Sequence, residues 1–173
     1  MAELIDHKII DMPKLWAIGV QVHVLNQGDN PLPAEWRRQL EAGLFDRLSA
    51  LPGAYSADTF GVIHSWPGDM SCFEYVMGML FTELPDELPE GCVAHELEAG
   101  RMLCGYVRGR DESFVIAGAH DLVMARADKS GYEFDIDRLC LIEGYNCPRF
   151  TQPDDQGRII FDYYIPVVKK SRK

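Results

Sequence analysis

The sequence predicts an α+β protein of two β-α-β-β modules related by a pseudo-twofold, with antiparallel sheets and a ligand cleft between the halves. Two observations carry this prediction. Only two stretches have the spacing of apolar residues typical of a helix, whereas many short stretches read as strands. The order strand, helix, strand, strand also occurs twice along the chain. With 173 residues, the chain fits a single domain, residues 1–173, with one sizeable core.

The first half, about residues 1–82, begins with strands predicted at 8–11 and 14–25. After a polar loop, Pro33 opens a helix that a Pro-Gly pair ends. The apolar residues of this helix are Trp36, Leu40, Leu44, Phe45 and Leu48. Strands at 58–65 and 72–82 follow. Alternate residues of the strand at 72–82 point to one side: Phe73, Tyr75, Met77, Met79 and Phe81.

The second half, about residues 92–173, repeats this order after an acidic, proline-bearing linker at about 83–91. Its strands are predicted at 92–98, 101–108, 132–134, 139–146 and 159–168, and its helix at 111–127. A tight turn at Ala99-Gly100 separates the first two strands. A cleft between two such half-domains is where a small ligand is expected to bind.

The charge balance argues against nucleic acid as a partner. The chain has 17 basic and 27 acidic residues, a formal net charge of -10, which repels phosphate backbones. The same field raises the local concentration of small cations, although an acidic surface also serves solubility alone.

The cysteines and the hydropathy pattern predict a cytoplasmic protein without a membrane partner. The five cysteines are an odd number and form no CxxC pair, as in a reduced protein. The N-terminal sequence has no apolar signal region, and no apolar run approaches the roughly 20 residues that span a bilayer.

Several classes of enzyme lack their signatures here. The sequence has no GxGxxG after a strand, no Walker loop, no HExxH and no GxSxG, and its five histidines have no metal-ligand spacing. We therefore expect neither a metal nor a cofactor, and binding rather than turnover is the first expectation.

The strand at 139–146 carries a carboxylate in its middle. Glu143 shares a face with Leu141 and Tyr145, and no Lys or Arg lies nearer in sequence than Arg138 and Arg149. An unpaired buried carboxylate costs several kcal/mol by rough estimate, so a ligand is one way to compensate its charge. The alternative is a solvated face on which Glu143 is an ordinary surface residue.

Aromatic residues on the predicted strands are the natural companions of this carboxylate. They are Phe60, Tyr75, Tyr106, Tyr145, Tyr163 and Tyr164, with Trp66 at a strand end. An aromatic face attracts an organic cation by roughly 0.5–2 kcal/mol. The alternative is that each ring belongs to the core of a small domain, but Glu143 and Tyr145 together favour a binding site.

Five runs of sequence, taken in order, resemble the GyrI-like, or AraC-type, effector-binding domain. They are Cys-Phe-Glu-Tyr-Val-Met-Gly-Met at 72–79, Tyr-Val-Arg-Gly at 106–109, Ser-Gly-Tyr-Glu at 130–133, Ile-Glu-Gly-Tyr at 142–145 and Asp-Tyr-Tyr-Ile-Pro-Val at 162–167. Such domains form the ligand-binding half of several bacterial multidrug-responsive transcription regulators and also occur alone. No helix-turn-helix segment precedes the first strand, so we expect a stand-alone module that does not bind DNA directly.

The resemblance implies a hydrophobic pocket for amphipathic, often cationic molecules. Carried over, Glu143 matches the pocket glutamate, Tyr145 its aromatic neighbour and Tyr164 the aromatic residue before Ile-Pro. Strand position alone adds the other expected pocket residues, which are Phe60, Trp66, Tyr75, Met77 and Tyr106.

Two other functions stay open. In the first, the protein is a hydrolase of electrophilic small molecules, with Glu143 as base or nucleophile and Tyr145 or Tyr106 assisting. In the second, it is an interaction module that inhibits a larger protein such as a topoisomerase. A homodimer is also open, because the sequence does not reveal which strands are edges.

Overall fold

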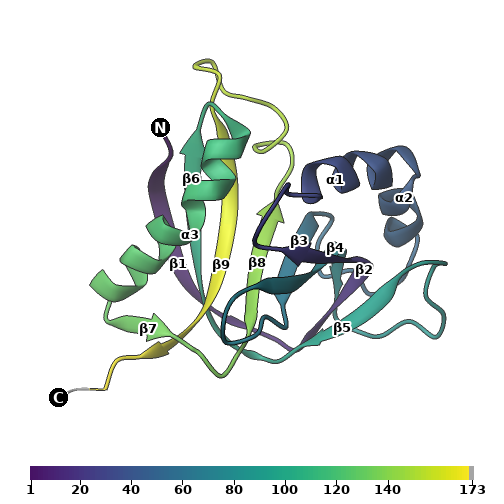
Figure 1. The fold of residues 1–173 in the computed structure, drawn as a ribbon, viewed down its shortest axis with the longest axis horizontal. Coiled ribbons are helices and arrows are strands. Elements are labelled where there is room, and N and C mark those ends of the chain that lie inside the picture. The colour runs from purple at the N-terminus through teal and green to yellow at the C-terminus, as the bar shows by residue number, and fades with distance from the viewer. Residues whose placement is uncertain (172–173) are drawn as a thin grey trace. The chain divides into compact units, whose positions relative to one another are not determined.

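The computed structural model describes residues 1–171, which form two compact units (Figure 1). Unit 1 contains residues 1–12 and the chain from Gly100 onward, and unit 2 contains residues 13–99. The segment 83–91, expected as a linker, lies inside unit 2. Within the described part of the chain, no helix is both long and apolar enough to cross a membrane.

Unit 2 is a four-stranded antiparallel sheet with two helices. Its elements are β2 (Leu15–Leu25), α1 (Leu32–Glu41), α2 (Leu44–Ser49), β3 (Thr59–His64), β4 (Cys72–Phe81) and β5 (Val93–Leu97). The strand order is β3-β4-β2-β5. The single helix expected between Pro33 and the Pro52-Gly53 pair is wrong, because Gly43 adopts a left-handed conformation with φ 69° and separates α1 from α2.

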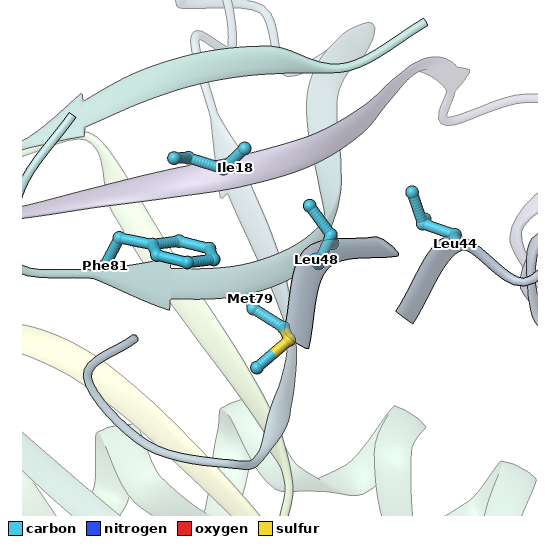
Figure 2. Packing of buried hydrophobic residues seen from close by; sticks show 5 residues of the cluster. All are labelled: Ile18, Leu44, Leu48, Met79 and Phe81. Atoms are coloured by element: carbon cyan, nitrogen blue, oxygen red, sulfur yellow. The ribbon is translucent and has the colours of Figure 1, made fainter. Parts of the chain in front are cut away.

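The core of unit 2 lies between the helices and one face of the sheet. Leu44 and Leu48 of α2 pack against β2 and β4, as Figure 2 shows. The buried residues of this cluster are Ile18, Leu44, Leu48, Met79 and Phe81. A second cluster joins Tyr75 and Met77 to Val24, with Trp36 and Phe45 against it. The alternate residues of β4 therefore pack on the helix side, as the period of two predicts.

Unit 1 is built in the same way around one long helix. Its elements are β1 (Glu3–Met12), β6 (Gly100–Gly109), α3 (Glu112–Lys129), β7 (Tyr132–Phe134), β8 (Cys140–Tyr145) and β9 (Ile159–Lys169). The strand order is β1-β6-β9-β8, and β7 pairs with the end of β9. The Asp111 side chain caps α3 by accepting a hydrogen bond from the Phe114 backbone.

Each unit therefore contains a β-α-β-β module with an added edge strand, and unit 1 also has the short strand β7. Within the unit, the three strands of the module always follow the order first, third, second: β2-β4-β3 and β6-β9-β8. The added strand pairs with the first, β5 with β2 and β1 with β6. The strands on either side of the turn expected at Ala99-Gly100 do not pair with each other, because β5 pairs with β2 whereas β6 pairs with β1 and β9. The mixed α+β class is confirmed.

Candidate functional site

Glu143 lies on the helix-covered face of the unit 1 sheet. It pairs across the strands with Tyr163, which in turn pairs with Gly105. A Cβ built on Gly105 would point at Val123 of α3, so this face is the one that α3 covers. The Glu143 side chain is buried, with 8% of the residue exposed. The alternative of a carboxylate on a solvated face is therefore wrong.

Tyr145 supports the carboxylate directly. Its hydroxyl donates a hydrogen bond to Oε2 of Glu143 over 2.8 Å. Residues two apart on a strand share a face, which is why both side chains point the same way. This hydrogen bond satisfies one acceptor of the buried carboxyl group.

Three more rings surround this pair. Tyr145 meets Phe150 edge-on with ring centroids 4.9 Å apart, and it meets Phe161 at 5.3 Å. Phe161 also lies against Tyr163. Sequence reasoning missed Phe150 and Phe161 as site residues. Phe161 could have been found, since it alternates with Tyr163 on β9, but Phe150 lies in a loop without a periodic signal.

Tyr163 connects the carboxylate to α3. Its hydroxyl lies 3.3 Å from Nδ1 of His120, and the two rings meet edge-on. Burial, and next the charge of Glu143, raise the pKa of Tyr163. Burial also lowers the pKa of His120, against the opposing charge of Asp121. At neutral pH, the phenol and the imidazole are therefore both uncharged.

Tyr106 and Tyr164 lie on the opposite face of the same sheet. Tyr106 pairs with Asp162 on β9, and Tyr164 is two residues further along. Two cationic side chains of the protein itself lie over the Tyr106 ring. Arg149 Cζ is 4.9 Å and Lys8 Nζ 5.6 Å from the ring centroid. Arg149 is also ion-paired with the buried Asp162. These two tyrosines are therefore not brought together with Glu143.

The remaining expected site residues belong to unit 2. Tyr75 is fully buried, and its hydroxyl lies 3.2 Å from Nε1 of Trp36, which donates to it. Met77 lies in the same helix-covered core. Phe60 is buried on the other face of that sheet, opposite Gly78, and Trp66 is half-buried in the loop after β3.

The buried thiols are poorly suited to nucleophilic chemistry. Burial raises the pKa of Cys104 to about 12 and that of Cys140 to about 11, so both stay protonated. Among residues 1–171, no group of three or more His, Cys, Asp or Glu side chains is placed to hold a metal ion. The Glu143 site can supply a negative charge, a hydrogen-bond acceptor or a base.

No protein-family model and no curated protein matches this sequence. Several solved structures do match over nearly the whole chain. SAV2435 bound to tetraphenylphosphonium is 12% identical, covers 95% of this chain and 94% of its own, and has a TM-score of 0.69.

Two further structures agree with it. A putative bacterial transcription regulation protein from Staphylococcus aureus MU50 is 14% identical, with coverage of 94% and 97% and a TM-score of 0.63. The C-terminal domain of EcmrR is 11% identical, with coverage of 95% and 98% and a TM-score of 0.61. At such identities the likeness concerns the fold, and we conclude that the chain has the GyrI-like fold of these proteins.

Proposed function

We propose that this protein binds small amphipathic organic cations, with Glu143 as the counter-charge. The observation that carries the proposal is the burial of the Glu143 carboxylate among aromatic rings, where 8% of the residue remains exposed. Removing a carboxylate from water costs several kcal/mol by rough estimate, and a bound cation offsets that cost.

The surroundings of Glu143 favour a particular kind of cation. The rings of Tyr145, Phe150 and Phe161 offer apolar area and negative ring faces. Each such face attracts a cation by roughly 0.5–2 kcal/mol, most strongly when the charge is poorly hydrated. An organic cation whose charge is delocalised and surrounded by its own aromatic rings is poorly hydrated and has a large apolar surface. It therefore suits these rings better than a small ammonium ion does. Tetraphenylphosphonium, the molecule bound to SAV2435, has this chemistry.

Replacing Glu143 by Gln is expected to weaken tetraphenylphosphonium binding by about 1.5–3 kcal/mol, or roughly 10- to 150-fold in Kd, the range for losing a charged partner. Isothermal titration calorimetry at low ionic strength measures the change. Tetraphenylborate has the same shape and the opposite charge, so the wild-type protein should prefer the phosphonium, and Glu143→Gln should remove most of that preference.

Glu133→Gln is the matched control, because Glu133 is an exposed carboxylate on β7 of the same unit. This variant should bind tetraphenylphosphonium as the wild-type protein does. Equal affinities of the Glu143→Gln variant and the wild-type protein would reject Glu143 as the counter-charge.

The hydrogen bond between Tyr145 and Glu143 also favours a second candidate function. A carboxylate with a phenol 2.8 Å away can act as a base or nucleophile while the phenol donates a proton, as a hydrolase of electrophilic small molecules requires. Incubation with strained or electrophilic compounds and mass spectrometry of the products tests this. Product that forms with the wild-type protein and not with Glu143→Gln would support the hydrolase, and binding without product would favour the first function.

A further inference from the structure

Two histidines of unit 2 meet across the sheet. His64 is the last residue of β3, and His95 lies on β5, at the other end of the strand order β3-β4-β2-β5. Their rings are stacked, with centroids 3.7 Å apart and an angle of 18° between the planes. In a flat sheet, two strands would separate these side chains, so the sheet must be strongly coiled.

A pair of glycines in the middle of the sheet accounts for the coiling. Gly19 of β2 and Gly78 of β4 lie directly opposite each other. A Cβ on Gly19 would lie 2.0 Å from the Met77 carbonyl oxygen, and one on Gly78 would lie 1.9 Å from that of Ile18. The two strands therefore bend toward each other on the glycine side. That inner side is the face away from α1 and α2, and it carries Phe60, which pairs with Gly78.

His64 is buried in this bend, with 5% of the residue exposed. Its Nδ1 lies 2.7 Å from the Ser65 hydroxyl, while its Nε2 is buried and has no hydrogen-bond partner within the described chain. Ser65 has a positive φ of 54°, which is strained for a residue other than glycine. The imidazole is thus held between a strained turn and the ring of His95.

The carboxylates near the two rings are engaged by other groups. Glu74 pairs with His64 across the strands, but it binds His23 over 2.7 Å and Gln21 over 3.0 Å. Glu96, next to His95, forms an ion pair with Lys14 over 2.8 Å. A proton on either stacked ring would therefore gain little from a carboxylate and would lose hydration.

We propose that His64 and His95 form an acid-sensitive clasp, which holds β3 and β5 together across the inner face of unit 2 and opens when an imidazole takes up a proton. Opening would expose Phe60 and Val62, which are buried on that face. The clasp is independent of the proposed ligand site at Glu143.

The expected direction with pH follows from the protons that each state binds. Burial, and next the neighbouring His95, lower the pKa of His64 to about 4, and burial lowers the pKa of His95 against the charge of Glu96. An opened His64 would titrate near its ordinary value of 6.5. The closed state therefore has its full advantage over the open state above about pH 6.5 and loses it as the pH falls toward 4. At pH 5, the ratio of closed to open molecules is about 30-fold lower than at neutral pH.

NMR of the whole protein tests the clasp. Between pH 7.5 and pH 5, ring-current-shifted imidazole signals of His64 and His95 should fade. Amide exchange in β3 and β5, corrected for the intrinsic rate, should accelerate by about 30-fold. The core of β4 should stay protected. His7→Gln, which alters an imidazole of unit 1 that contacts Ser130 and lies outside the stack, should behave as the wild-type protein does.

The variant His64→Phe keeps a ring and removes the main titrating group, so acid should no longer accelerate exchange in β3 and β5. If this variant does not fold, His95→Ala serves instead, because it removes the stack and should open β5 already at pH 7.5. Unchanged exchange in wild-type β3 and β5 down to pH 5, or opening of all strands together, would overturn the clasp.

Discussion

Gly78→Ala is expected to lower the free energy of unfolding by about 3 kcal/mol or more, or to prevent folding altogether. The added Cβ would lie 1.9 Å from the Ile18 carbonyl oxygen and 2.8 Å from the Gly19 Cα. Both atoms belong to the backbone of the neighbouring strand. No rotamer change can relieve this clash, and β2 and β4 would have to separate at the centre of their ladder.

Gly118→Ala makes the same chemical change in the middle of α3, but it should raise the free energy of unfolding. A Cβ there would meet the Ala2 Cβ at 3.6 Å, which is ordinary van der Waals contact. Alanine is favoured over glycine in a helix by about 0.5–1 kcal/mol, so this variant should be more stable than the wild-type protein. Urea denaturation of both variants gives the comparison, and similar stabilities of the two would contradict the close approach of β2 and β4.

The elements that local patterns specify were predicted closely. The strand expected at 72–82 is Cys72–Phe81, and the one expected at 132–134 is Tyr132–Phe134. Local patterns do not predict which strands are neighbours, because strand pairing joins residues far apart in sequence. Neither the pairing of β1 with β6 nor the close approach of Gly19 and Gly78 leaves a local signal. The break at Gly43 was missed because glycine is tolerated inside many helices.

For the candidate site too, sequence predicts what depends on local spacing and not what depends on strand pairing. Glu143 and Tyr145 are two residues apart, so the period of a strand was enough to place them on one face. Whether Tyr163 or Tyr164 joins them depends on the register between β8 and β9, which sequence does not specify. In the structure, Glu143 pairs with Tyr163, and Tyr164 therefore points to the other face.

The other face of unit 1 contains an ion pair whose loss should also be costly. Arg149→Met is expected to lower the free energy of unfolding by about 2–4 kcal/mol. Asp162 would then lack the guanidinium charge in a position where 4% of its side chain is exposed. The Tyr106 ring would also lose a cation 4.9 Å from its centroid, worth roughly 0.5–2 kcal/mol by itself.

Arg101→Met is the matched control, because Arg101 pairs with Asp11 at the surface of the same unit, where 38% and 78% of the two side chains are exposed. Exposed pairs contribute about 0–1 kcal/mol, so this variant should be nearly as stable as the wild-type protein. The double variant Arg149→Met/Asp162→Leu removes both charges and keeps their approximate shapes. It should recover most of the lost stability, because the cost comes from a buried charge left behind and not from the absent attraction. Equal losses in the single and double variants, measured by urea denaturation, would show that packing of the Arg149 side chain and not its charge stabilises this face.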